Sequence, residues 1–111
     1  MTPYAFSTVG RSVSLWFVGY NLGMYYVYVL QSLSDRNFYT GFANNLENRI
    51  KKHDNGSVEA TKFRRPLKLV YYEACINKKD ALSRELYLKT AWGKRFIKNR
   101  IKRYLENGGP G

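Results

Sequence analysis

The stretch from Tyr26 to His53 constrains the fold of this 111-residue chain more than any other part of the sequence. Residues 25–30 are almost all aromatic or β-branched, which favours an extended chain. The Ser, Asp and Asn cluster of residues 32–37 predicts a turn. Residues 38–42 predict a second extended segment, so the three pieces together predict a β-hairpin.

A helix is expected directly after this hairpin. Asn44 is the predicted N-cap, and Glu47, three residues later, completes a capping box. Leu46, Ile50 and His53 follow at helical spacing. The Asp-Asn-Gly sequence of residues 54–56 predicts the end of this helix.

The rest of the chain predicts one more strand and two more helices. Residues 67–74 form the strand, and Asn77 with Asp80 caps the second helix. Its expected buried stripe consists of Ala81, Leu82, Leu86 and Leu88, and Gly93 is expected to break it. Residues 94–106 form the third helix. The expected fold class is therefore α/β (α+β), with a small, mainly antiparallel three-stranded sheet flanked by helices.

Composition and charge limit the function classes. The length fits one domain, and 44% apolar residues argue against disorder. A net charge of +11 favours a polyanionic partner, with nucleic acid ahead of an anionic membrane surface. One cysteine, Cys75, excludes an internal disulfide and fits the reducing cytoplasm. One cysteine and one histidine also exclude a structural zinc site of the usual Cys/His kind.

The first 23 residues differ from the rest, because they contain one charged residue, Arg11, and no acidic residue. Residues 13–30 are apolar enough to suggest a membrane segment, but Ser14, Gly19 and Asn21 interrupt them and their last part is needed as the first strand. No signal-peptide pattern is present either. The expected organisation is an N-terminal extension over residues 1–23, a domain over residues 24–105 and a flexible end over residues 106–111.

Polar side chains converge on the hairpin and its helix. Tyr28 and Tyr39 stand on adjacent strands, and Arg49 and His53 share one helix face. The ordered set of Tyr26-Val27-Tyr28, Tyr39-Thr40-Gly41, Arg49, His53, Arg64-Arg65-Pro66 and Glu85 resembles the GIY-YIG nuclease domain. The chain is most similar to the small stand-alone GIY-YIG proteins and, more distantly, to the nuclease part of the UvrC repair protein. This resemblance covers residues 24–105 and implies a three-stranded antiparallel sheet with flanking helices.

The resemblance also implies a metal-dependent DNA endonuclease. Glu85 matches the metal-binding glutamate, with Mg²⁺ or Mn²⁺ as the expected cofactor and no small-molecule cofactor. Arg49 offers a fork for a phosphate oxygen. One of the two tyrosines is the implied general base, with Tyr28 preferred and Tyr39 as the second tyrosine of the site. His53 matches a proton-relaying position, and Asn99 matches a late asparagine that orients the site.

Three positions depart from the family pattern. Tyr26 replaces the first glycine of the motif, and Thr40 replaces isoleucine. Phe42 stands where some relatives carry a lysine, so one positive charge of the site is missing.

The expected DNA-binding surface consists of basic residues from the loop after the first helix and from the third helix. Its members are Lys62, Arg64, Arg65, Lys94, Arg95, Lys98, Arg100, Lys102 and Arg103. Phosphate contacts of this kind give affinity without sequence information. Three functions remain open from the sequence: an endonuclease acting in DNA repair or on branched or single-stranded DNA, a non-catalytic nucleic-acid-binding module, and a membrane-attached basic protein.

Overall fold

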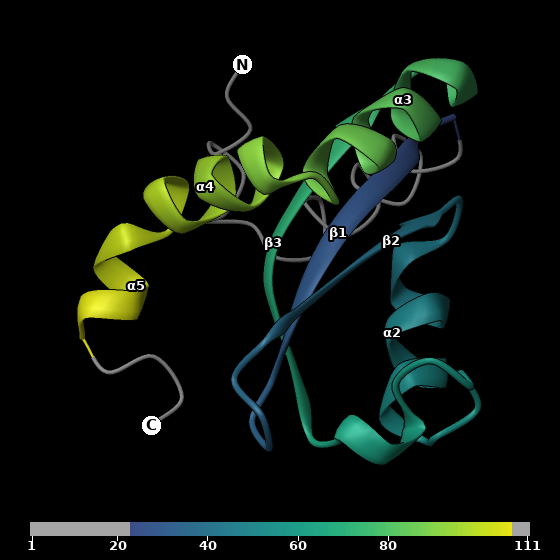
Figure 1. Cartoon of the computed structure of the whole chain (residues 1–111). Helices are drawn as coiled ribbons and strands as arrows, with labels where there is room; N and C mark the ends of the chain where they lie inside the picture. Colours follow the sequence, from purple (N-terminus) through teal and green to yellow (C-terminus); the bar gives the residue numbers. More distant parts are fainter. Residues whose placement is uncertain (1–22, 108–111) are drawn as a thin grey trace, which may run out of the picture.

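The computed structural model describes residues 23–107, which form a three-stranded antiparallel sheet flanked by helices (Figure 1). The strands are β1 (Tyr25–Ser32), β2 (Phe38–Ala43) and β3 (Leu67–Cys75), in the order β2-β1-β3. The helices are α2 (Leu46–Asp54), the 3₁₀ turn η2 (Lys62–Arg64), α3 (Lys78–Leu88), α4 (Ala91–Arg100) and α5 (Lys102–Glu106). The predicted α+β class and the predicted hairpin are both confirmed.

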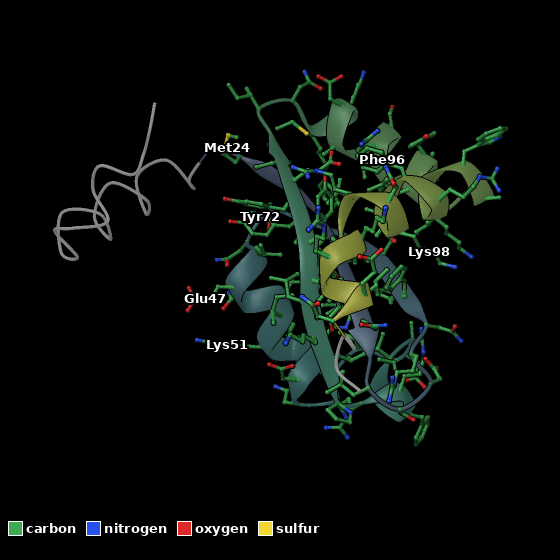
Figure 2. The ribbon with its side chains drawn as sticks, turned by 90° about the vertical axis from the view of Figure 1, so that its left-hand side faces the viewer. Met24, Glu47, Lys51, Tyr72, Phe96 and Lys98 are labelled. Atoms are coloured by element: carbon green, nitrogen blue, oxygen red, sulfur yellow. The ribbon has the colours of Figure 1, made fainter. Side chains whose placement is uncertain are left out.

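The central strand β1 is buried on both faces, which explains its continuous run of aromatic and β-branched residues. One face packs Tyr28 and Leu30 against α2, and the other packs Val27 and Val29 against α3 and α4. Figure 2 views the sheet from its side, with Glu47 of α2 to one side and Phe96 and Lys98 of α4 to the other. Residues that alternate along β1 therefore serve two separate cores.

Four details of the predicted helices are wrong, and the first two concern the N-cap of α2 and the buried stripe of α3. The N-cap of α2 is Asn45, whose side chain accepts a hydrogen bond from the Asn48 backbone N–H, because β2 continues to Ala43 and leaves Asn44 in a bend. On α3 only Ala81 and Leu88 of the predicted stripe are buried, whereas Leu82 and Leu86 are exposed. The inward-facing stripe instead consists of Ala81, Glu85 and Leu88, at spacing i, i+4, i+7.

Gly93 does not break a helix, contrary to expectation. It lies inside α4, where a Cβ atom would collide with the backbone of Tyr87 and Leu88 at the crossing of α3 and α4. The break falls at Thr90, whose side chain caps α4 by accepting the Gly93 N–H. The predicted single helix of residues 94–106 is likewise two helices, separated at Ile101.

Residues 1–22, nearly the whole of the expected N-terminal extension, lie outside the described part of the chain, as do residues 108–111 of the expected flexible end. The apolar sequence of residues 25–30 belongs to β1. Among residues 23–107, no helix has the length and apolar character needed to cross a membrane.

Candidate active site

The pairing of β1 with β2 places Tyr28 opposite Gly41 on the face that α2 covers. A Cβ atom at Gly41 would collide with the hydroxyl and ring of Tyr28. The glycine at this position therefore gives the Tyr28 ring the space to lie across β2. The side chain of Tyr28 is fully buried, with its hydroxyl directed at α2.

A chain of three buried polar groups starts at this hydroxyl. The Tyr28 hydroxyl and His53 Nε2 share a hydrogen bond of 2.7 Å, and His53 Nδ1 shares another of 2.7 Å with Thr61 Oγ1. All three side chains are fully buried. Arg49, one helical turn before His53, donates from Nε to the Tyr28 hydroxyl at 3.4 Å.

These contacts occupy both nitrogens of the His53 ring. Burial, assisted by the positive charge of Arg49, lowers the pKa of His53 from 6.5 to about 4, so the ring is neutral at pH 7. A neutral ring carries one N–H, so His53 donates to one of Tyr28 and Thr61 and accepts from the other.

Arg49 connects this buried chain to the surface. The hydrogen bond to Tyr28 raises the pKa of Arg49, so the guanidinium stays charged. Its side chain also borders a shallow depression of about 300 Å³. The other residues around that depression are mostly polar and comprise Phe42, Ala43, Asn44, Asn45, Asn48 and Lys52. Arg49 is thus half-buried against Tyr28 and still accessible to an anion.

Tyr39 is the partly exposed member of the tyrosine pair. Its ring centre lies 6.5 Å from that of Tyr28 and 5.2 Å from that of His53. Burial raises the pKa of Tyr28, a rise that the Arg49 hydrogen bond opposes and that the neighbouring Tyr39 and Glu85 increase. The two tyrosines therefore differ in burial: Tyr28 is fully buried, and Tyr39 is partly exposed.

Glu85 reaches this region from the opposite side of the sheet. It stands on the buried stripe of α3 between Ala81 and Leu88, and its side chain is only 17% exposed. Lys89 Nζ lies 3.0 Å from its carboxylate. The sequence alone allows an ordinary surface i, i+4 pair here, but the low exposure of Glu85 distinguishes it from such a pair. Its negative charge is felt at Tyr28, where it raises the pKa.

The donor set around Glu85 limits the kind of metal site. Residues 23–107 contain no cluster of three or more His, Cys, Asp and Glu side chains suited to a metal ion. A single carboxylate fits Mg²⁺ or Mn²⁺, because such ions keep several waters and take further oxygen ligands from phosphates. It does not fit zinc, which needs three or four protein ligands.

The structure does not bring every predicted residue to this region. Asn99 lies on the exposed side of α4, two residues past the buried Ile97. The loop residues of the predicted DNA surface are engaged within the molecule. Arg64 contacts Asp35 at 3.0 Å, Lys62 lies 3.3 Å from Glu59, and Arg65 donates to backbone carbonyl groups.

The basic residues of the last two helices differ from those of the loop. Within residues 23–107, none of Lys94, Arg95, Lys98, Arg100 and Arg103 takes part in an ion pair. All five are exposed. The surface of α4 and α5 therefore presents positive charge that no acidic side chain of the described residues neutralises.

Two residues beside the site have no role that the sequence assigns. Thr61 lies in a mixed polar loop, and no sequence pattern distinguishes it from its neighbours. Lys89 has a weak signal, because it follows Glu85 by four residues on one helix. Only the fold reveals that Thr61 contacts the sole histidine of the chain.

The class of protein is thus a small α+β domain with a buried tyrosine–histidine pair, an arginine beside it, and a partly buried glutamate on a helix of the other sheet face. Residues 24–101 match the model of the GIY-YIG catalytic domain, and the chain belongs to this family of nucleases.

Similar proteins include a UPF0213 protein of Clostridium perfringens, which is 52% identical over 67 residues covering 60% of this chain and 71% of that protein. A UPF0213 protein of Pediococcus acidilactici is 38% identical over 90 residues, covering 77% and 84%. The solution NMR structure of a UPF0213 protein from Bacillus halodurans is 32% identical, covers 68% of this chain and 83% of that chain, and has a TM-score of 0.45.

Proposed function

We propose that this protein is a metal-dependent DNA endonuclease that hydrolyses phosphodiester bonds. The observation that carries the proposal is the buried hydrogen bond between Tyr28 and His53, with Arg49 donating to the same tyrosine oxygen. A tyrosine that serves only as a core aromatic residue needs no such hydrogen bonds. Here the hydrogen bonds hold the Arg49 guanidinium in one position beside a second, partly exposed tyrosine, Tyr39.

In this mechanism Arg49 binds a non-bridging oxygen of the scissile phosphate through the part of its guanidinium that borders the surface depression. Tyr28 and His53 orient Arg49 and neutralise none of its charge. The positive charge is therefore available as negative charge develops on the phosphate.

We assign the proton transfer from the attacking water to Tyr39 rather than to Tyr28. A general base needs direct or one-water contact with its substrate, and Tyr39 is accessible whereas Tyr28 is fully buried. The sequence alone favours Tyr28 as the general base. The complete burial of Tyr28 is the reason why we now prefer Tyr39.

Glu85 would hold a divalent ion, Mg²⁺ or Mn²⁺, which when bound would supply charge stabilisation and assistance to the leaving oxygen. The carboxylate suits this role because it lies on the partly buried stripe of α3, with Lys89 Nζ 3.0 Å away. Lys89 would supply a cation for a phosphate of the substrate at the same place.

DNA is the proposed substrate because the unpaired basic residues of α4 and α5 suit a phosphate backbone. No sequence specificity is proposed, since phosphate contacts carry no base information. A cytoplasmic location accords with the single cysteine. A role in DNA repair, on branched or single-stranded DNA, accords with the family.

The test is a cleavage assay on single-stranded, duplex and branched DNA with Mg²⁺ or Mn²⁺. Glu85→Gln should abolish cleavage and leave DNA affinity in metal-free buffer nearly unchanged, because it removes one ligand charge. Glu47→Gln is the matched control, since Glu47 pairs with Lys51 at the same i, i+4 spacing but is exposed. Cleavage by Glu85→Gln at the wild-type rate would contradict the metal assignment.

A second comparison distinguishes the roles of the two tyrosines. Tyr39→Phe should lose cleavage and keep thermal stability, because Tyr39 is partly exposed and the ring that packs beside Tyr28 is retained. Tyr28→Phe should lose both, because it leaves the buried His53 nitrogen without its partner, at a cost of about 1–3 kcal/mol. A stable, inactive Tyr28→Phe beside an active Tyr39→Phe would reverse the assignment.

The second candidate function is a nucleic-acid-binding module without catalysis. The unpaired charge of α4 and α5 favours it as much as it favours a nuclease. Binding without cleavage of any of the three DNA structures, with either metal, would decide for the module.

A further inference from the structure

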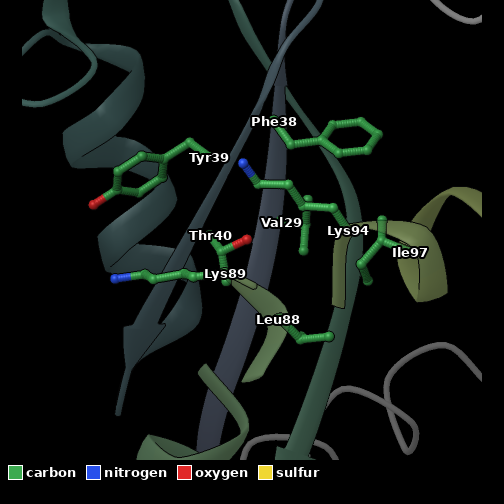
Figure 3. Close-up of a pocket in the computed structure, with 8 residues that line it drawn as sticks. All are labelled: Val29, Phe38, Tyr39, Thr40, Leu88, Lys89, Lys94 and Ile97. Carbon is green, nitrogen blue, oxygen red and sulfur yellow. The ribbon is translucent and has the colours of Figure 1, made fainter. Parts of the chain in front are cut away.

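A pocket of about 210 Å³ lies between β2 and the junction of α3 with α4, next to the candidate active site. Eight residues line it: Val29, Phe38, Tyr39, Thr40, Leu88, Lys89, Lys94 and Ile97 (Figure 3). The volume is below the ~300–1,000 Å³ of typical small-molecule pockets. It is therefore suited to a fragment the size of one ring system and not to a whole cofactor.

The lining has two chemically different parts. Val29, Leu88 and Ile97 are fully or almost fully buried and form an apolar floor, with the ring of Phe38 beside them. The rim carries Lys94 and the base of Lys89, whose cationic end leaves the pocket and lies 3.0 Å from the Glu85 carboxylate. In Figure 3 the Lys94 side chain extends from α4 across the pocket toward β2. An apolar floor with one cation across it, and a second cation leading from its edge toward Glu85, fits a flat, weakly polar ring attached to an anionic chain.

The pocket and the candidate active site share residues. Tyr39 lines the pocket and also packs its ring 5.2 Å from that of His53. Lys89 lines the pocket and lies 3.0 Å from Glu85. In Figure 3 the side chains of Tyr39 and Lys89 point to the same side, toward α2. A nucleotide ring in the pocket would thus belong to the same stretch of DNA as a phosphate held between Arg49 and Glu85.

We propose that this pocket binds one unpaired base of the DNA substrate, next to the scissile phosphate, while Lys89 and Lys94 hold the phosphates that flank it. The proposal rests on the proposed function in taking DNA as the partner. A base stacked in a duplex cannot enter the pocket, so the substrate is DNA with an unpaired nucleotide at the cleavage site. The cost of unstacking is lowest where the nucleotide is already unpaired.

The experiment measures binding by fluorescence anisotropy in metal-free buffer with EDTA. Three labelled duplexes share one sequence: one is fully paired, one has a single bulged base, and one has the same bulge with the base removed. Wild-type protein should prefer the bulged base to the abasic bulge by about tenfold, which is about 1.4 kcal/mol and within the range for one base contact. Both bulged duplexes have the same phosphates, so the ratio reports the base alone.

Thr40→Phe fills the pocket from the rim with a residue that a strand accommodates. It should reduce the ratio to about one and keep the affinity for paired DNA. Lys98→Ala is the control, because Lys98 is exposed on the same helix as Lys94 and does not line the pocket. This control should weaken binding to all three duplexes and keep the tenfold ratio.

If Thr40→Phe fails to fold, wild-type protein with 2-aminopurine at the bulge gives a second measurement. Bound 2-aminopurine should be protected from acrylamide quenching, and quenching equal to that of free DNA would overturn the proposal. A wild-type ratio of one, or a ratio that Thr40→Phe leaves intact, would also overturn it. If the protein cleaves DNA but its ratio is one, the base-binding pocket is rejected and the nuclease proposal stands. If the ratio is tenfold but no DNA is cleaved, the pocket stands and the nuclease proposal is rejected.

Discussion

Acidification should destabilise this protein through His53. His53 is fully buried and neutral, with a pKa of about 4 in the folded chain against 6.5 in its ordinary state. The unfolded chain therefore binds a proton more readily than the folded chain does. The stability contributed by neutral His53 is complete above pH ~6.5 and is lost as the pH falls toward ~4.

The size of this effect follows from the two pKa values. At about 1.36 kcal/mol per pH unit between them, protonation of His53 costs about 3 kcal/mol in total. Between about pH 7 and about pH 5 the loss is about 2 kcal/mol. That is a large part of the ~5–15 kcal/mol that stabilises a typical domain. The hydrogen bond from Arg64 lowers the pKa of Asp35 below 3.8, so that carboxylate acts only at more acidic pH.

Urea unfolding followed by circular dichroism at several pH values measures this effect. The control is His53→Gln, which does not titrate and should lose the slope between pH ~6.5 and ~4 although its stability at neutral pH is lower. Because His53 is the only histidine of the chain, its imidazole NMR signals can be followed without assignment of others. Equal stability at about pH 7 and about pH 5, or an imidazole that titrates near 6.5, would refute the reasoning.

Three further predictions concern close packing and charge. Gly41→Ala should displace the Tyr28 ring and destabilise the fold by about 1–3 kcal/mol, as measured by thermal unfolding. Wild-type stability of this variant would contradict the close packing of Tyr28 on Gly41. Gly93→Ala should also destabilise by about 1–3 kcal/mol, although alanine favours an exposed helix, and a gain in stability would show that α3 and α4 can separate. Replacing Arg100 and Arg103 by alanine should lower the salt dependence of DNA binding by about one unit of slope for each phosphate that the protein no longer neutralises, and an unchanged slope would place DNA elsewhere.

The sequence predicts the hairpin and the order of elements well, because their signals are local. Aromatic and β-branched residues mark β1, and Asn77 caps α3 as expected. The four-residue spacing of Arg49 and His53 predicts a shared helix face, and both side chains contact Tyr28 in the structure. Local chemistry is sufficient for these features.

Features that depend on the approach of distant segments could not be predicted. The two neighbouring residues Asn44 and Asn45 are equivalent as caps in sequence, and the length of β2 selects the second. Leu82 and Leu86 resemble core residues, but the packing of α3 buries the stripe that contains Glu85 instead. The contact of Thr61 with His53 depends on the path of the loop that joins them.

The rotation of α3 about its own axis sets the direction of Glu85. Arg84, the preceding residue, fixes that rotation: its guanidinium contacts Glu73 of β3 at 2.9 Å and lies over the rings of Tyr87 and Phe96. Each residue turns a helix by about 100°, so one residue inserted between Arg84 and Glu85 would turn the carboxylate by that angle away from its present direction. The direct succession of anchor and carboxylate is thus a fixed dimension of the molecule.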